Sequence, residues 1–507
     1  MLLTAAAVVL GGVCFLRVAL RAGPGTKPDE AARHALRLTA LGAAVVAAAQ
    51  LAVAALTLGT LVLGLGAGAA SAFGDAWFAR ASCVRVVLAL ATAALALALA
   101  RGPAGPLAWA ALTAAAGLLV ATSASISHAM ARLDHRAWLL TFDATHQLAA
   151  AVWVGGLVHL VRAPSLDRTA LRRFSSLAAA SVVVLVASGF ALSVAYAGDP
   201  GALVQTAYGV MVLTKTVLLV AMLALGFANF RAVRAAAARA GETRLARFVE
   251  VEAGLAITVV FAAASLTSLP PAVDIGADRA TLAEVGARFS GLPPRLASPD
   301  VGELLRQTDP LAGGPQARLQ IEREWSEFNH HWAGLFVLAM GLGAIAHRAG
   351  VRAARHWPLF LVGLALFLFV RNDPEVWPLG PIGFFESLAQ PEILQHRLFM
   401  LLVTAFGLFE WAVRTGRLSP RPWASVFPVL CAAGGGLLLT HSHTVFSLKE
   451  AFLMEVTHAP IGVLGAFAGW ARWLELRLPE AGQWPGRVWS TCLVAIGVLL
   501  IVYSEGR

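Results

Sequence analysis

The sequence predicts an all-α, polytopic integral membrane protein, folded as a helical bundle of about 14 transmembrane helices. Three observations support this fold class. Hydrophobic residues make up 58% of the 507 residues. Charged residues make up only 13%, about half of the roughly 25% that is usual in soluble domains. The apolar residues also gather in runs of about 20, the length that an α-helix needs to cross a bilayer. Ordinary soluble domains and intrinsic disorder are therefore excluded.

The apolar runs divide the chain into two membrane parts. Eight predicted spans precede a long polar segment and lie at about 2–20, 36–60, 82–100, 105–123, 140–161, 174–197, 206–229 and 251–270. Six follow it, at about 331–347, 357–370, 394–413, 424–440, 455–474 and 488–504. The predicted domains are an eight-helix membrane domain at 1–270, an extracytoplasmic loop at 271–329 and a six-helix membrane domain at 330–507. The loop is rich in proline, glycine and mixed charge, so we expect it to be partly ordered.

The basic residues set the expected orientation. When successive spans alternate in direction, 24 of the 39 lysines and arginines fall on one side of the membrane. The positive-inside rule makes that side cytoplasmic, which places both termini outside. Arginines between apolar spans account for the formal charge of +10. Binding to nucleic acid is therefore not expected, and the lipid bilayer is the expected partner of the basic side chains.

Histidines gather at the predicted outer membrane boundary. Six in the C-terminal domain lie at outer ends of spans, namely His330, His331, His396, His441, His443 and His458. Imidazole is a ligand for copper, zinc and iron, and the thioether of methionine favours Cu(I). Two methionines stand four residues from such a histidine, Met400 from His396 and Met454 from His458. This spacing puts both side chains on one helix face, where they can share an ion.

Other interpretations of these residues stay open. A histidine at a membrane interface is often an amphipathic anchor, and a methionine in a helix is most often a packing residue. Histidines that face each other from two helices of a bundle also hold b-type haem, which is the alternative to a copper site. We predict at least one metal or haem site among the six outer histidines.

Ionisable residues inside predicted spans are rare and costly, so each suggests a function. Lys215 lies about ten residues into the seventh span, and Asp143 stands three residues before His146 in the fifth. Asp143 and Lys215 are candidates for an ion pathway. The alternatives are a structural ion pair for Lys215 and a simple hydrogen-bonded pair of Asp143 with His146. Glu250 and Glu252 open the eighth span on its inner side, where contact with water explains them.

Four stretches of the sequence resemble the copper resistance protein D family. They are HQLAAAVWVGGL at 146–157, RRFSSLA at 172–178, TAYGVMVLTKTVLLVAMLALGFANFR at 206–231 and VEAGLAITVVFAAASLTSLPPA at 251–272. Members of this family are integral proteins of the bacterial inner membrane that move or handle copper. The resemblance implies that His146 is a metal ligand. The C-terminal helices resemble the extensions of long family members and, more distantly, oxidase assembly proteins that deliver copper.

The expected function is therefore copper handling at the bacterial inner membrane. Outer histidines and methionines would capture copper ions from the extracytoplasmic side, and the ions would pass inward through the bundle, for import or homeostasis. A periplasmic copper chaperone is a candidate partner. The alternatives are a b-type haem redox protein and an assembly factor that hands copper to a respiratory oxidase. No GxSxG, HExxH or GxxxxGK[ST] motif occurs, so we expect a transporter or metal-handling protein, not an enzyme.

Overall fold

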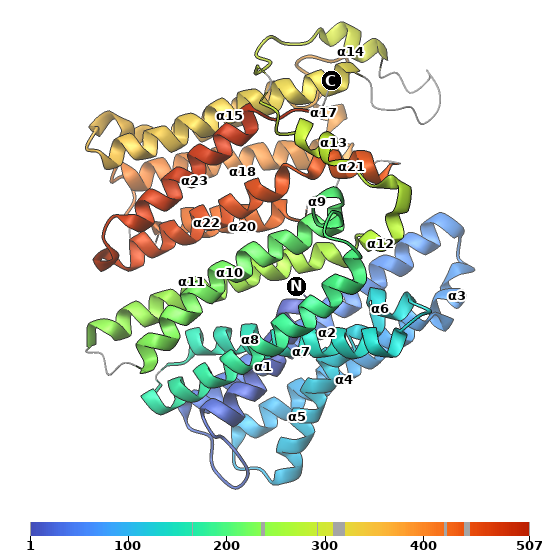
Figure 1. The fold of residues 1–507 in the computed structure, drawn as a ribbon, viewed down its shortest axis with the longest axis vertical. Helices are drawn as coiled ribbons and strands as arrows, with labels where there is room; N and C mark the ends of the chain where they lie inside the picture. Colours follow the sequence, from blue (N-terminus) through green and yellow to red (C-terminus); the bar gives the residue numbers. More distant parts are fainter. Residues whose placement is uncertain are drawn as a thin grey trace. The chain divides into compact units, whose positions relative to one another are not determined.

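The computed structural model of the chain describes residues 2–164, 166–234, 239–291, 293–307, 320–419, 423–440 and 447–505. Within these residues the ordered elements are helices, with one isolated β-bridge between Val376 and Ile382. The all-α prediction is confirmed. Contacts divide the chain into two compact units (Figure 1). Unit 1 consists of Met1–Asp199 and Lys215–Asp274, and unit 2 of Pro200–Thr214 and Ile275–Arg507. The predicted domain boundaries near residues 270 and 330 stay a prediction.

Unit 1 is built from long helices joined by short turns. Its long helices are α1 (Leu2–Cys14, continued by a π-helical turn at Phe15–Ala19), α2 (Glu30–Leu65), α4 (Trp77–Arg101), α5 (Pro106–Ala121), α7 (Arg136–Arg162), α8 (Arg168–Ala197), most of α10 (Ala207–Arg234) and α11 (Arg239–Leu266). The short helices α3 (Ala69–Asp75), α6 (His128–Ala131) and α12 (Ala272–Ile275) lie in the connections.

Unit 2 contains the remaining helices. The long ones are α15 (Gln320–Arg348), α16 (Leu359–Arg371), α18 (Pro391–Arg414), α20 (Val426–Leu438), α22 (His458–Arg477) and α23 (Trp484–Ile501). The short ones are α9 (Ala202–Gln205), α13 (Leu282–Ala287), α14 (Val301–Gln307), α17 (Phe384–Ser387) and α21 (Leu448–Glu455). Helix α15 begins at Gln320, so the end of the predicted outer loop is already helical.

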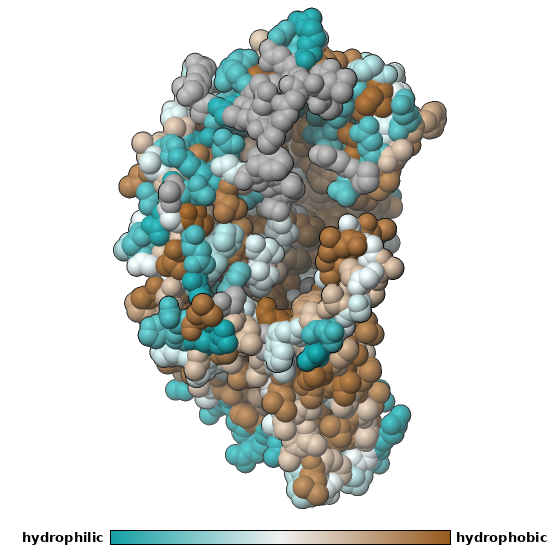
Figure 2. Space-filling model, turned by 90° about the vertical axis from the view of Figure 1, so that its right-hand side faces the viewer, coloured by the Kyte–Doolittle hydropathy of each residue, from teal (hydrophilic) through white to brown (hydrophobic). Residues whose placement is uncertain are grey.

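The helices have the length and surface of membrane spans. Among the described residues, ten helices are long and apolar enough to cross a bilayer, and three more apolar helices are shorter. Many large apolar side chains are exposed on them, for example Leu63, Val183 and Phe190. Figure 2 shows brown, hydrophobic side chains exposed across the lower part of one face. The multi-pass membrane prediction is confirmed, whereas the number of 14 spans stays a prediction.

Close helix packing in unit 1 depends on glycine. Helices α1 and α7 are in contact, and a Cβ atom added at Gly155 would lie 1.8 Å from the carbonyl oxygen of Ala7. Small residues let two backbones approach in this way inside a membrane, where packing and not the hydrophobic effect holds helices together. Gly155 therefore fixes α7, which carries Asp143 and His146, against α1.

A glycine seam also joins α15 to α23 in unit 2, and the two helices lie side by side in Figure 1. Added Cβ atoms at Gly334, Gly341 and Gly497 would each lie under 3.0 Å from backbone atoms of the facing helix. Helix α23 also packs against α22. The seam therefore brings the start of α15, with His330 and His331, beside the residues that follow α23.

The segment before α15 is attached to the rest of unit 2 by an ion pair. Lys449 Nζ, next to the start of α21, lies 2.6 Å from Glu284 Oε1 on α13. Glu284 also completes a capping box with Thr281, in which each residue's side chain bonds the other's backbone. The Lys449 ammonium, together with Thr281, lowers the pKa of Glu284 from 4.5 to about 2.

We expect replacement of Gly155 by alanine to destabilise the protein by about 2 kcal/mol, the usual cost of overpacking a tight contact. The measurement is thermal unfolding in detergent. Gly117→Ala on α5 is the matched control, because an added Cβ there meets nothing within 4 Å, and alanine favours a helix more than glycine does. Equal stability of the Gly155 variant and the wild type would show that α1 and α7 do not pack this closely.

The attachment of α13 to α21 should depend on pH. Because the folded pKa of Glu284 is about 2, its stabilising effect is fully present above about pH 4.5 and is lost as the pH falls toward 2. Hydrogen exchange of residues 281–287, corrected for its intrinsic pH dependence, measures this. Lys449→Met should raise the exchange rate at pH 7, and Lys449→Arg should not. Equal exchange in both variants would contradict a role for the cation.

Candidate functional site

Two of the predicted outer histidines meet in unit 2. The ring centroids of His330 on α15 and His458 at the start of α22 are 6.0 Å apart, with the rings edge to face. Tyr503, just after α23, stacks on His330 with a centroid separation of 4.0 Å, and its ring lies 6.5 Å from that of His458. Residues from α15, from the start of α22 and from the turn after α23 therefore converge on one place. His330 does not open its helix, as its predicted span implied, but lies ten residues after the start of α15 at Gln320.

Each of the two imidazoles is oriented by a backbone carbonyl four residues earlier, His330 by one on α15 and His458 by one on the preceding short helix α21. His330 Nδ1 lies 2.8 Å from the carbonyl oxygen of Ser326, and His458 Nδ1 lies 3.1 Å from that of Met454. A carbonyl oxygen only accepts hydrogen bonds, so Nδ1 carries the hydrogen in both rings and Nε2 carries the lone pair. Metal-binding histidines typically donate their second nitrogen to such a carbonyl. Nε2 is therefore the atom through which either ring would bind an ion.

His331 is held differently from its neighbour. It is 3% exposed. Its Nδ1 accepts the backbone N–H of Arg295 at 2.6 Å, and its Nε2 donates to the carbonyl oxygen of Tyr503 at 2.8 Å. With both nitrogens bonded to backbone, His331 would have to give up a hydrogen bond to bind a metal. These two hydrogen bonds connect Arg295 to Tyr503, which follows α23.

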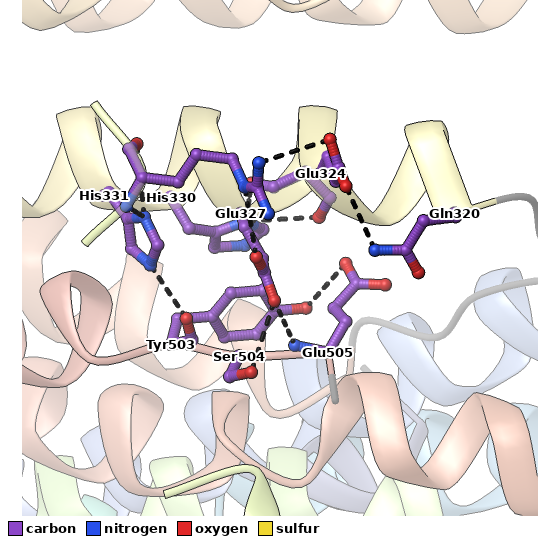
Figure 3. A network of polar contacts seen from close by, with 10 residues as sticks. Gln320, Glu324, Glu327, His330, His331, Tyr503, Ser504 and Glu505 are labelled. Carbon is purple, nitrogen blue, oxygen red and sulfur yellow. Dashed lines mark hydrogen bonds and ion pairs between the residues drawn. The ribbon is translucent and has the colours of Figure 1, made fainter. Parts of the chain in front are cut away.

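Charged side chains hold the residues after α23 in place (Figure 3). Glu327 on α15 is 6% exposed and accepts hydrogen bonds from Ser504 Oγ at 3.2 Å and from the Glu505 backbone N–H at 3.1 Å. Arg295 lies 3.5 Å from Glu327 and 3.2 Å from Glu324. Tyr503 donates its hydroxyl to Glu505. Tyr503 was not predicted as a site residue, although it follows the last span directly.

His396 and Met400 lie on α18 in another network of contacts. His396 Nδ1 lies 2.6 Å from Asp373 Oδ1 and 2.9 Å from Asn372 Nδ2. Asp373 is 8% exposed and Met400 is 4% exposed. A carboxylate that bonds one ring nitrogen is the usual orienting partner of a metal-binding histidine. The structure thus supplies such a partner for His396.

The remaining predicted ligands of unit 2 have different outcomes. His441 and His443 lie outside the described residues. Met454 contributes its carbonyl oxygen to His458. Within the described ranges no group of three or more His, Cys, Asp or Glu side chains is arranged to hold a metal ion. The two-imidazole pair of His330 and His458 is therefore the arrangement that the structure offers, and its role as a ligand pair stays a prediction.

In unit 1, His146 on α7 faces α8 and α10. Its Nδ1 lies 3.1 Å from the carbonyl oxygen of Leu185 and 3.2 Å from Ser188 Oγ, both on α8. A Cβ added at Gly189 would lie 2.9 Å from His146 Cε1, so α8 leaves room for the ring. Lys215 on α10 interacts electrostatically with both His146 and Asp143. The three ionisable residues predicted inside these spans are thus brought together.

Asp143 lacks a complete set of partners there. Its Oδ2 atom is buried and has no hydrogen-bond partner. Buried polar atoms are normally paired, and unpaired ones are found at functional sites. A carboxylate with a spare acceptor and an oriented imidazole therefore lie on α7, under the electrostatic influence of Lys215 on α10.

Comparison with known proteins agrees with the sequence resemblance. Residues 168–266, from the start of α8 to the end of α11, match the family of copper resistance protein D. A relative, the copper transport protein CutJ of Bacillus subtilis (strain 168), is 34% identical over 165 residues, which is 30% of this chain and 29% of CutJ. The chain therefore matches less than a third of that relative's length. No solved structure matches the chain.

The matched region contains Lys215, whereas Asp143 and His146 precede it on α7. The matched region also contains Glu252, for which the sequence-based interpretation as a water-exposed residue was wrong. Glu252 is buried, with 4% of its surface exposed. It accepts hydrogen bonds from Asn229 Nδ2 at 2.9 Å and from Trp153 Nε1 at 3.3 Å. Its position inside the apolar run VEAGLAITVV was the signal that should have been used.

Proposed function

We propose that this protein takes up copper ions from the extracytoplasmic side of the bacterial inner membrane and passes them inward, for import or homeostasis. Three findings support copper handling in a membrane: the match to the copper resistance protein D family, the similarity to a copper transport protein, and the apolar helices. The orientation, with both termini outside, rests on the distribution of basic residues.

The proposal rests above all on the distance between His330 and His458. A metal–imidazole bond is about 2 Å long and a ring centre lies about 1 Å behind its nitrogen, so two imidazoles bound linearly to one ion have centres about 6 Å apart. The observed separation is 6.0 Å. The two rings come from helices far apart in the sequence, so local helix geometry does not explain this distance.

The ligand chemistry favours Cu(I) as the captured ion. Imidazole and thioether are ligands that Cu(I) accepts, and Met454 and Met400 each stand four residues from an outer histidine. A site with two imidazoles and few further ligands also binds weakly enough to release the ion again, which transport requires. We therefore propose His330 and His458 as the capturing pair, with His396 and Met400 as a second outer position.

We propose Asp143, His146 and Lys215 as a later position on the ion's path, within unit 1. Asp143 and the lone-pair nitrogen of His146 attract a cation, and the nearby Lys215 ammonium repels it. Because this attraction and this repulsion oppose each other, a cation would occupy the position briefly and then leave it. Lys215 would thereby act on the release of the ion and not on its capture.

Replacing His458 with alanine should weaken Cu(I) binding by more than roughly ten-fold, because one of two imidazoles is lost. His330→Ala should have the same effect, and the double variant should be little worse than either single one. Affinity is measured by competition with a chromogenic Cu(I) chelator, using the purified full chain.

His356→Ala is the control for these variants. His356 accepts a hydrogen bond from Trp411 Nε1 at 2.8 Å, away from the proposed ligands, so copper affinity should be unchanged. Equal affinity in the wild type and the His330 and His458 variants would reject this copper site.

A strong Soret band in the absorption spectrum would instead identify b-type haem. Loss of oxidase activity on deletion without copper flux in sealed vesicles would identify an assembly factor.

Lys215→Met should slow copper flux into sealed vesicles by roughly ten-fold while leaving Cu(I) affinity at the outer pair unchanged, because the repulsion that speeds release is gone. His146→Ala should also lower the flux and leave the outer pair intact. If Lys215→Met only lowers thermal stability and the flux per folded protein is normal, Lys215 is a structural partner of Asp143.

A further inference from the structure

Unit 1 encloses a cavity that the copper path does not use. It has a volume of about 720 Å³ and lies among α7, α8, α10 and α11. Its walls are largely apolar and include Leu157, Phe174, Leu223, Phe227 and Phe230. The volume falls within the range of small-molecule binding sites, which combine apolar walls with a few placed polar groups.

One polar group in the cavity wall is the buried carboxylate of Glu252. Its two hydrogen-bond donors, Trp153 and Asn229, also line the cavity, and both are neutral. Helix α10 approaches the carboxylate of Glu252 closely at Gly226, where an added Cβ would lie 3.1 Å from Glu252 Oε1. Among the described residues no cationic side chain lies within ion-pair distance of Glu252. A negative charge on Glu252 is therefore hydrogen-bonded but not balanced.

A second carboxylate in the same wall differs in this respect. Glu250 lines the cavity two residues away on α11 and forms an ion pair with Arg247. Its charge is therefore balanced by its own helix. In addition, the buried Oδ1 atom of Asn229 has no hydrogen-bond partner. The unsatisfied polar groups of the cavity are thus concentrated around Glu252.

We propose that this cavity binds a lipophilic organic cation, with the positive charge next to Glu252 and the apolar body among the aromatic and aliphatic side chains. A buried carboxylate without a countercharge favours a cationic ligand strongly, and aromatic faces attract cations as well. A bare metal ion would leave the apolar walls unused, and a lipid acyl chain would leave Glu252 unbalanced. This function is independent of copper handling.

The test uses the full chain in nanodiscs of neutral lipid, without copper. Two probes of the same shape and opposite charge are compared, tetraphenylphosphonium and tetraphenylborate, with empty nanodiscs as the background. The wild type should bind the phosphonium in preference to the borate. Glu252→Gln keeps the side-chain volume and should weaken phosphonium binding by roughly ten-fold or more, which removes the preference.

Two further variants make the test decisive. The double variant Arg247→Gln with Glu250→Gln should bind the phosphonium like the wild type, because it removes both members of an ion pair and leaves the net charge of the cavity wall unchanged. Ala178→Phe, which fills the cavity from α8, should weaken binding of the phosphonium while leaving Glu252 unchanged. Undiminished phosphonium binding in Glu252→Gln, or equal losses in Glu252→Gln and in the double variant of Arg247 and Glu250, would overturn the proposal and indicate binding at the surface or in the lipid.

Discussion

The contact between the backbones of α15 and α23 is the constraint on which the arrangement in unit 2 depends. Glycines at 334, 341 and 497 let the two helices approach until a single added carbon would collide with the facing backbone. This seam sets which end of α15 lies beside the residues after α23, and so it places His330 against Tyr503. The packing of α22 on α23 then brings His458 to the same place.

Buried polar side chains in this protein are of two kinds. Some are satisfied within the bundle, as is Arg85, which is 2% exposed and donates to Gln50 and Ser123. Such groups hold helices together, since lipid offers no partner for an unpaired donor. Others keep an unmatched charge or acceptor, as do Glu252 and Asp143. The proposals for an ion position and for a cation-binding cavity both start from groups of the second kind.

Much of the fold follows from the sequence, but the convergence of side chains does not. Apolar runs predict helices because a bilayer demands them, and the predicted ranges fall on helices in the structure. Helix α15 starts well before its predicted span, because the turn that carries Glu324 and Glu327 is amphipathic and not apolar. The pairing of His330 with His458 depends on which helices pack together, which hydropathy does not report. Arg85 was missed because its apolar run was used only to place a span. Glu252 was named but taken as solvated, because its burial depends on contacts with Trp153 and Asn229 on other helices, which hydropathy does not report.

The way in which His330 and His458 are oriented has a consequence for the proposed ligand pair. His330 bonds a carbonyl of its own helix α15 and His458 bonds a carbonyl of the preceding helix α21, so neither ring depends on the other for its orientation. The proposed pair therefore needs only that the helix ends carrying the two rings be brought together, because each ring is already oriented by its own stretch of backbone.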